Sequence, residues 1–193
     1  MSRNKILESI NQNELPAIPL PDFDLSVFGM VTDNHVVFKN TLNNIGGKVY
    51  EVRNISEASN ILYKDFPDSK KIISLVDGID NSTVDLKNII STSDLNDLDL
   101  AIINGSFGVA ENGAVWVTEK DIVLRSVPFI TKYLVIILNM NYLVENMHEA
   151  YLRLKDYKEG YGVFIAGPSK TADIEQSLVI GAQGPLSLTL FLI

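Results

Sequence analysis

The sequence contains no cysteine, which excludes disulfides, thiolate zinc sites, iron–sulfur clusters held by this chain and cysteine nucleophiles. Histidine is nearly absent too, since only His35 and His148 occur. Both lie in segments with a helical pattern, and their spacing does not bring them together, so we assign neither a catalytic nor a metal-binding role. We expect no metal and no cofactor in this chain, and any redox centre must belong to another protein.

Basic residues are in the minority, because 24 Asp and Glu face 16 Lys and Arg and give a net charge of −8. No stripe of Lys and Arg stands out, so we expect no nucleic acid partner. No apolar run reaches the length of about 18 residues that a membrane span requires, and the N-terminal residues lack the apolar core of a signal peptide. These absences predict a soluble, cytoplasmic protein.

The 193 residues, of which 46% are hydrophobic, suffice for one sizeable core. A short amphipathic helix is expected over Ser2–Asn11, and three prolines in the following Leu15–Pro21 favour an extended stretch. We therefore divide the chain into an N-terminal helix and Pro-rich tether, residues 1–32, and one domain, residues 33–193. We expect the tether to run over the surface, with the N-terminal helix docked elsewhere or on a second copy of the chain.

Helices and strands alternate in the pattern expected of the domain. A helix over Asp33–Asn44 ends at Gly46-Gly47, and Ser56 is expected to cap a second helix, Glu57–Asp65. A third helix is expected from Asn141 to Lys155. The expected strands are Lys48–Val52, Lys71–Val76, Leu98–Asn104, Ala114–Thr118, Ile122–Arg125, Tyr133–Asn139, Tyr161–Ala166 and Leu188–Ile193, the fourth and fifth forming a hairpin-like pair. This order predicts the α/β class, with a mixed, mostly parallel sheet in a three-layer α/β/α arrangement.

The first candidate site is the glycine-rich segment Asn104–Val115. Three glycines in nine residues let backbone amides approach a ligand closely, and Glu111 is a carboxylate that can bind or attack. The alternative is equally compatible with the pattern: Glu111 is a solvated turn residue, and Asn112-Gly113 makes a tight turn. The candidate residues are Gly105, Ser106, Gly108, Glu111, Asn112 and Gly113.

The second candidate site consists of two polar, glycine-bounded loops, Gly167–Glu175 and Gly181–Pro185, between apolar runs. A phosphate-binding P-loop is excluded, because the positions that need glycine hold Ser169 and Phe164. An anion can still be held there, or Ser169 or Thr171 is merely the cap of a helical turn beginning at Ala172. The candidate residues are Ser169, Lys170, Thr171, Asp173, Glu175 and Gln183.

We expect the two candidate segments to meet in one pocket, because ligands of parallel α/β sheets collect outside the carboxyl ends of the strands. Its acidic side chains repel an anion, so Lys170, backbone amides and hydroxyl groups must supply the attraction. A small anionic molecule is therefore the expected ligand.

Ala110-Glu111-Asn112-Gly113, the Pro128 segment before an apolar strand, and Ser169–Glu175 with Gly181–Pro185 together resemble the lactate-utilization protein C family, the LUD domain. The resemblance covers most of the chain from about Asp33 onward and is most specific in the C-terminal part. It implies a three-layer fold related to sugar isomerases and CoA transferases. It also implies a link to bacterial L-lactate oxidation alongside iron–sulfur partner proteins.

The chain departs from the family at several positions. The family has Glu-Thr-Gly-Thr where this chain has Glu111-Asn112-Gly113-Ala114, and it favours His where Thr131 and Gln183 align. Neither Thr nor Gln titrates near neutral pH, so an acid–base role at these positions is lost.

Two functional hypotheses follow. The first is an accessory or small-molecule-binding protein of L-lactate or related organic acid utilization. The second is a stand-alone acyl- or CoA-transferase-like or folate cyclo-ligase-like enzyme, because Ala110–Gly113 is similar to the Ser-Glu-Asn-Gly motif of CoA transferases. That resemblance implies Glu111 as the nucleophile.

Overall fold

The computed structural model of the chain describes residues 3–13, 18–19, 24, 33–80, 82–86, 89, 91–158, 160–172 and 178–193. Its α-helices are α1 (Arg3–Gln12), α2 (Asn34–Asn44), α3 (Ile55–Asp65), α4 (Glu119–Ile122), α5 (Val127–Ile130) and α6 (Met147–Leu154), with 3-10 turns η3 (Thr92–Leu95) and η4 (Met140–Tyr142). Its strands are β1 (Lys48–Glu51), β2 (Ile72–Ser74), β3 (Leu100–Asn104), β4 (Phe107–Val109), β5 (Ala114–Thr118), β6 (Tyr133–Leu138), β7 (Leu143–Val144), β8 (Gly162–Ile165), β9 (Lys170–Ala172), β10 (Leu178–Ile180) and β11 (Ser187–Leu192).

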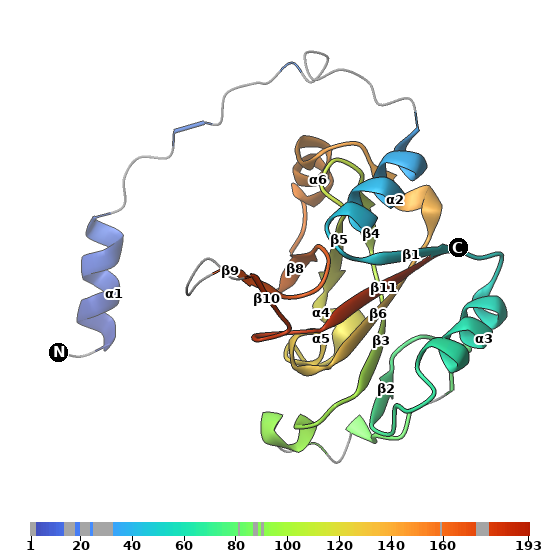
Figure 1. Cartoon of the computed structure of the whole chain (residues 1–193). Coiled ribbons are helices and arrows are strands. Elements are labelled where there is room, and N and C mark those ends of the chain that lie inside the picture. The colour runs from blue at the N-terminus through green and yellow to red at the C-terminus, as the bar shows by residue number, and fades with distance from the viewer. Residues whose placement is uncertain are drawn as a thin grey trace.

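The central sheet has five strands in the order β1-β11-β6-β3-β2, and all four pairings are parallel (Figure 1). Tyr133 at the start of β6 pairs with Ser187 of β11 on one side and Leu100 of β3 on the other. Because parallel strands start at one edge of a sheet, the segments that precede β1, β2, β3, β6 and β11 lie side by side. We call this edge the amino edge and the opposite one the carboxyl edge.

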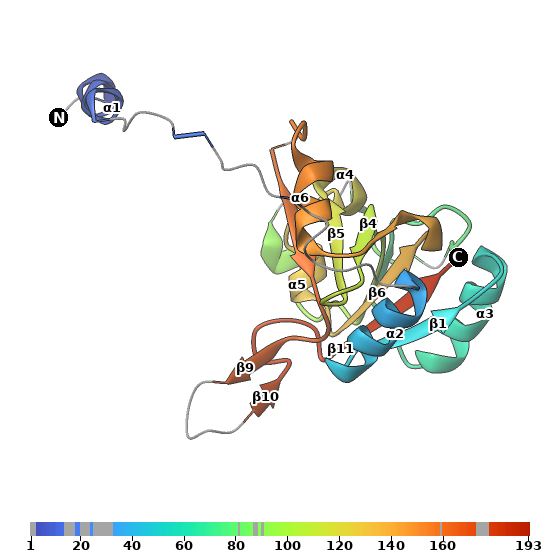
Figure 2. The same cartoon turned by 90° about the horizontal axis from the view of Figure 1, so that it is seen from above.

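A second sheet of four strands has the order β7-β4-β5-β8, in which β5 is antiparallel to β4 and β8. A separate antiparallel pair, β9 and β10, forms an arm that extends away from the body (Figures 1 and 2). The arm lies on the same side of the molecule as the start of β11.

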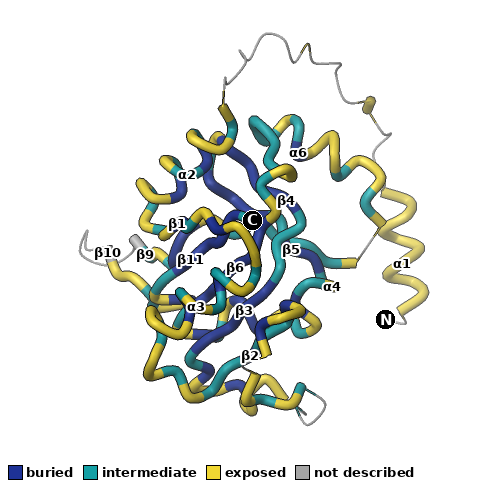
Figure 3. The backbone as a smooth tube through the Cα atoms, turned by 90° about the vertical axis from the view of Figure 1, so that its right-hand side faces the viewer, coloured by how far each residue is buried: buried dark blue, intermediate teal, exposed yellow. Residues whose placement is uncertain are grey.

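The core is organised by the alternation of side chains along the strands. In β6, Leu134, Ile136 and Leu138 pack on the face that also contacts α2 and β5, whereas Val135 and Ile137 face α3. The outer face of the second sheet is covered by α6, and the dark tube of Figure 3 follows the central strands. Both faces of the central sheet are thus buried, as expected for parallel strands with near-continuous apolar sequences.

The predicted α/β class and the mostly parallel central sheet are confirmed. The helix at α2 is also confirmed: the Asp33 carboxylate accepts hydrogen bonds from the amides of His35 and Val36, and Gly46, with φ of +93°, follows its C-cap. The predicted cap of α3 is wrong by two residues. Asn54 and not Ser56 accepts the hydrogen bond from the Glu57 amide.

The predicted hairpin of Ala114–Thr118 with Ile122–Arg125 is wrong. The Asp121 carboxylate accepts hydrogen bonds from the Thr118 amide and hydroxyl, which starts a helix directly after β5. The antiparallel neighbour of β5 is instead β4, which the sequence did not reveal as a strand.

The predicted start of the third helix at Asn141 is also wrong. Leu143 and Val144 pair with Gly108 and Val109 as β7, and the helix begins only after Asn146, which caps it. The helical turn expected from Ala172 does not begin there, since Lys170–Ala172 is strand β9, so the helix-cap alternative for Ser169 or Thr171 is wrong.

The N-terminal helix is present as α1, and every one of its residues is exposed. Figures 1 and 2 show it apart from the body. Of Leu15–Pro21, only Ile18 and Pro19 lie within the described residues. None of the described helices has the length and apolarity needed to cross a membrane.

Candidate functional site

The amino edge of the central sheet carries a continuous row of polar contacts. The residues that precede β2, β3, β6 and β11 are Lys71, Asp99, Lys132 and Leu186. The Leu186 amide donates to the Lys132 carbonyl at 2.8 Å, and the Asp99 amide donates to the Lys71 carbonyl at 2.9 Å. The strand starts are therefore tied together by backbone as well as by side chains.

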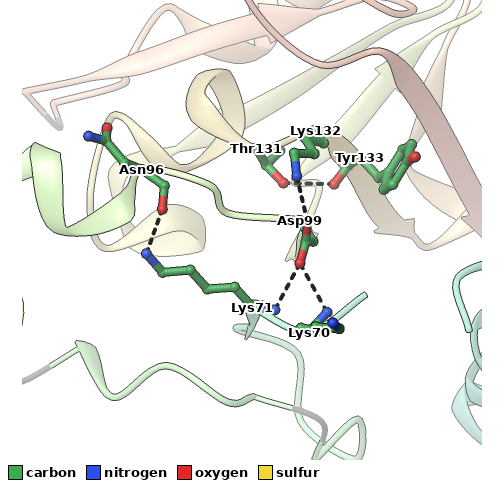
Figure 4. A network of polar contacts seen from close by, with 7 residues as sticks. All are labelled: Lys70, Lys71, Asn96, Asp99, Thr131, Lys132 and Tyr133. Carbon is green, nitrogen blue, oxygen red and sulfur yellow. Dashed lines mark hydrogen bonds and ion pairs between the residues drawn. The ribbon is translucent and has the colours of Figure 1, made fainter. Parts of the chain in front are cut away.

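Asp99 is the centre of this network, which Figure 4 shows from close by. Its Oδ1 accepts from Lys132 Nζ at 2.8 Å, and its Oδ2 accepts from the amides of Lys70 and Lys71 at 3.0 Å each. The Lys132 ammonium, and then these two amides, lower the pKa of Asp99 to about 2. Asp99 is thus a fixed carboxylate that already occupies the ammonium and the two amides around it.

A hollow of about 330 Å³ opens beside this network. The end of α3 and the starts of β3 and β6 line it, and the Phe66 and Tyr133 rings lie there with centroids 5.3 Å apart. The lining residues are Asp65, Phe66, Pro67, Asp68, Ser69, Asp99, Lys132 and Tyr133. A second hollow of about 480 Å³ is lined by Lys70, Lys71, Thr83, Val84, Asp85, Ile89 and Asp94.

The family-specific C-terminal loops also lie at the amino edge and not at the carboxyl edge where we expected the site. The Ser169 amide donates to the Pro185 carbonyl, and the Gly181 amide donates to the Ser169 carbonyl, both at 2.9 Å. Pro185 is followed by Leu186, which is bonded to Lys132. These contacts place both loops next to the start of β6.

The candidate residues of these loops are unequally accessible. Lys170 and Gln183 are exposed, and Ser169 and Thr171 are half-buried. The Lys170 ammonium lies close to Gly46, just after α2, where a positive charge faces the negative end of the helix dipole. Asp173 and Glu175 lie outside the described residues.

Thr131 lies one residue before Lys132 at the same edge and is buried. Its hydroxyl donates to the Tyr133 carbonyl at 3.0 Å. The two positions at which the family favours His, Thr131 and Gln183, therefore both belong to the amino edge, with Gln183 in the loop bonded to Ser169.

The first half of the glycine-rich segment lies at the carboxyl edge. The Gly105 amide donates to Ile137, and a side chain at Gly105 or Gly108 would collide with packed apolar groups. The Ser106 hydroxyl donates to Asp121 at 2.9 Å. These residues hold the second sheet against the first, and the amides of Gly105 and Ser106 are used in that packing.

The second half of the segment turns toward α6. Glu111 is exposed, and its Oε2 accepts a hydrogen bond from the Met147 amide at 3.0 Å, at the positive start of α6. The Asn112 side chain accepts from the Ala114 amide, and Gly113 has φ of +69° with Leu42 against its Cα. The geometry gives Glu111 and Asn112 structural partners in the turn.

The turn before β5 and the turn after β8 are neighbours, because Val115 pairs with Ile165 in an antiparallel register. Gly113 packs on Leu42, and Gly167 packs on the carbonyl of Ile45. The two candidate segments thus approach each other beside the last turn of α2, while Gly105 and Ser106 are at the other end of β4. A pocket shared by both segments stays a prediction.

Sequence reasoning missed the charged network of the amino edge and the two hollows beside it. Lys70, Lys71, Asp99 and Lys132 belong to three separate segments, and each looks like an ordinary charge before a strand. A usable signal was present: Lys71, Asp99 and Lys132 stand within two residues of the starts of three predicted strands, and the starts of parallel strands must be adjacent.

A parallel sheet covered on both faces, with a charged network and a hollow at its amino edge, defines the molecule as an α/β domain. The chain belongs to the LUD domain family. The family's model matches residues 79–193, a stretch that contains β3, β6, β11 and both C-terminal loops.

Two curated relatives are named lactate utilization protein C. The protein from Shouchella clausii is 35% identical over 94 residues, 46% of this chain and 41% of the relative. The protein from Geobacillus thermodenitrificans is 30% identical over 112 residues, 55% of this chain and 45% of the relative. The matched segments therefore span less than half the length of these relatives.

A solved structure has a similar fold. The crystal structure of a DUF162 family protein from Deinococcus radiodurans gives a TM-score of 0.60 with 12% sequence identity, and the match covers 82% of this chain and 95% of the other. This likeness concerns the fold alone.

Proposed function

We propose that this protein acts in the utilization of L-lactate or a related organic acid, as an accessory or small-molecule-binding protein. The observation that carries the proposal is that the chain shares 30–35% identity with curated relatives that bear the name lactate utilization protein C. The identity lies in segments of 94 and 112 residues, and the family's model matches residues 79–193.

The chemistry of the amino edge supports a small carboxylate as ligand. Lys170 is an exposed cation, and its sequence neighbours Ser169 and Thr171 carry hydroxyls on the alternate positions at the start of strand β9. No ion pair joins Lys170 to a residue within the described part of the chain. The Ser169 amide is bonded to Pro185, so attraction must come mainly from the ammonium and the hydroxyl groups.

We extend the proposal to partners. Oxidation of lactate releases two electrons, and this chain has no thiolate with which to hold an iron–sulfur cluster. The electrons must then pass through other proteins, and iron–sulfur proteins are the partners that the family resemblance implies. A pull-down of the tagged chain from lactate-grown cells tests this point, and recovery of no iron–sulfur protein contradicts it.

Growth of the source organism tests the role itself. Deletion of the gene should abolish or strongly slow growth on L-lactate as sole carbon source and leave growth on glucose unchanged. The gene supplied in trans should restore growth. Equal growth of both strains on lactate would refute the role.

Calorimetry with L-lactate tests the ligand. Replacing Lys170 by Ala should weaken binding roughly tenfold to more than a hundredfold, because one charge-assisted contact is worth about 1.5–3 kcal/mol. Lys64→Ala, which removes an exposed lysine at the end of α3, should bind as the unaltered protein does. Equal affinity of the Lys170 and Lys64 variants would exclude this anion site.

The alternative, an acyl- or CoA-transferase-like enzyme with Glu111 as nucleophile, gains no support from the structure. One Glu111 oxygen is already bonded to the first amide of α6. Intact-mass measurement after incubation with acyl-CoA donors tests this alternative. A covalent adduct that is absent from Glu111→Ala would support an enzyme with Glu111 as nucleophile.

A further inference from the structure

Helix α1 presents an unpartnered docking face. Arg3, Ile6, Leu7 and Ile10 follow the spacing of one helical stripe, and the three apolar side chains are exposed by 45–58%. Lys5 and Glu8 lie on the opposite side. An isolated helix of ten residues is marginal in water, so we expect this stripe to need a partner surface.

A matching surface lies at the amino edge. Phe129 and Leu186 are large apolar side chains exposed by 41% and 46%. Gly184 lies against the Phe129 carbonyl, and the Leu186 amide is bonded to Lys132, which lines the 330 Å³ hollow. Leu186 and the hollow are therefore both next to Lys132, and Phe129 lies beside the loop that leads to Leu186.

The charges of the two surfaces also favour docking of α1 at the amino edge. The hollow is lined by Asp65, Asp68, Asp99, Lys132 and the Phe66 and Tyr133 rings. Lys48 pairs with Asp65 and Lys132 pairs with Asp99, so Asp68 is the lining carboxylate for which the described residues show no ion pair. The docking face of α1 carries one charge, that of Arg3, and no acidic residue. Its arginine precedes the apolar stripe by one turn, so the stripe can cover Phe129 and Leu186 while the guanidinium enters the acidic hollow.

The connecting chain is long enough. Residues 14–32 join Asn13 to Asp33, and a chain of that length spans up to about 65 Å when extended. Asp33 caps the start of α2, whose eleven residues cover about 17 Å and end at the amino edge beside Gly46. Helix α1 can thus reach the amino edge of its own chain.

We propose that α1 docks on the amino edge of its own chain, with Ile6, Leu7 and Ile10 on Phe129 and Leu186 and with Arg3 in the acidic hollow. The occupant is a segment of the same polypeptide. The inference does not depend on the lactate proposal, since no ligand takes part in it.

Cysteine cross-linking tests this directly, because the chain has no native thiol that could compete. In the full chain, Ile10→Cys combined with Leu186→Cys should form an intrachain disulfide at least about tenfold faster than Gln12→Cys with Leu186→Cys. Gln12 is half a turn away from the stripe. All three positions are exposed, so the substitutions do not disturb the core.

The rates are measured at low protein concentration from non-reducing gels and intact mass. Adding Arg3→Glu to the Ile10–Leu186 pair should slow cross-linking several-fold, and the unaltered pair should slow with added salt. Equal rates for the Ile10 and Gln12 pairs would overturn the proposal. Disulfide-linked dimers as the main product would overturn it as well, because they assign the helix to a second copy.

Discussion

The amino edge and the carboxyl edge of the parallel sheet differ in polarity and packing where the chain enters and leaves β3. At the amino edge, Lys71, Asp99 and Lys132 form a charged network beside an open hollow. At the carboxyl edge, the chain leaves β3 through Gly105, which is pressed against Val115 and Ile136. One edge is polar and accessible, and at this point the other is closed by packing.

This difference teaches that the rule placing ligands at carboxyl ends is a tendency of open α/β sheets, and a second sheet can cancel it. Here β4 and β5 follow directly after β3, and Val115 and Val117 of β5 join the core of the central sheet. The charged network lies at the amino edge, together with the C-terminal loops that carry the family resemblance.

The largest effect is expected where packing closes the carboxyl edge. A Cβ at Gly105 would lie 2.4 Å from Val115 Cγ1, so Gly105→Ala should destabilise the fold by about 2–3 kcal/mol through overpacking. Thermal unfolding should show a midpoint lower by about 4–12 °C. Gly160→Ala is the control, because its Cβ would meet nothing nearer than 3.9 Å. Equal midpoints for the two variants would contradict the tight closure of this edge.

A smaller effect is expected in the amino-edge network. Asp99→Ala removes three hydrogen bonds, one of them from the Lys132 ammonium, and should cost about 1–2 kcal/mol after allowance for solvent screening. Urea unfolding measures the loss. Asp68→Ala, which removes an exposed aspartate of the same hollow, should change stability by less than about 0.5 kcal/mol. A larger loss for Asp68 than for Asp99 would show that the hollow is organised differently.

The same network predicts a pH dependence. The pKa of Asp99 is lowered to about 2, so its ionised form stabilises the folded state above the ordinary pKa of an aspartate, and this stabilisation is lost as the pH falls toward about 2. The difference in stability between the unaltered protein and Asp99→Ala should be constant from about pH 5 to 7 and narrow below about pH 4. Urea midpoints of both proteins across that range measure it. A difference that stays constant through acid would mean that Asp99 contributes through packing alone.

The smallest effect is expected at Glu111. Glu111→Gln keeps an oxygen for the Met147 amide but removes a negative charge from the start of α6, which should cost about 0.5–1 kcal/mol. Glu8→Gln on the opposite side of α1 serves as control, and both are compared by urea unfolding. A loss above about 2 kcal/mol would give Glu111 a larger role than that of a helix cap.

Elements fixed by local chemistry could be predicted from the sequence. The apolar runs of β6 and β11, the Asp33 cap and the glycines after α2 each depend on residues close by in the sequence, and each was located correctly. The α/β class follows from the order of such elements.

Elements that depend on partners far away in the sequence could not be predicted from it. Strand β4 has three residues, one of them Gly108, and is a strand only because β5 and β7 pair with it. The same pairing delays the start of α6 to Met147. The amino-edge hollow needs the topology β1-β11-β6-β3-β2, which brings together residues more than thirty positions apart, such as Asp99 and Lys132.

The position of β11 has a consequence for how this protein is made. Strand β11 is inserted between β1 and β6, so the central sheet cannot close until the ribosome has released the residues up to Leu192. Until then β1 and β6 each expose an apolar edge that is open to pairing with another chain. The newly synthesised protein must therefore wait in an incomplete, aggregation-prone state, and production at low temperature or with a chaperone should raise the yield of folded protein.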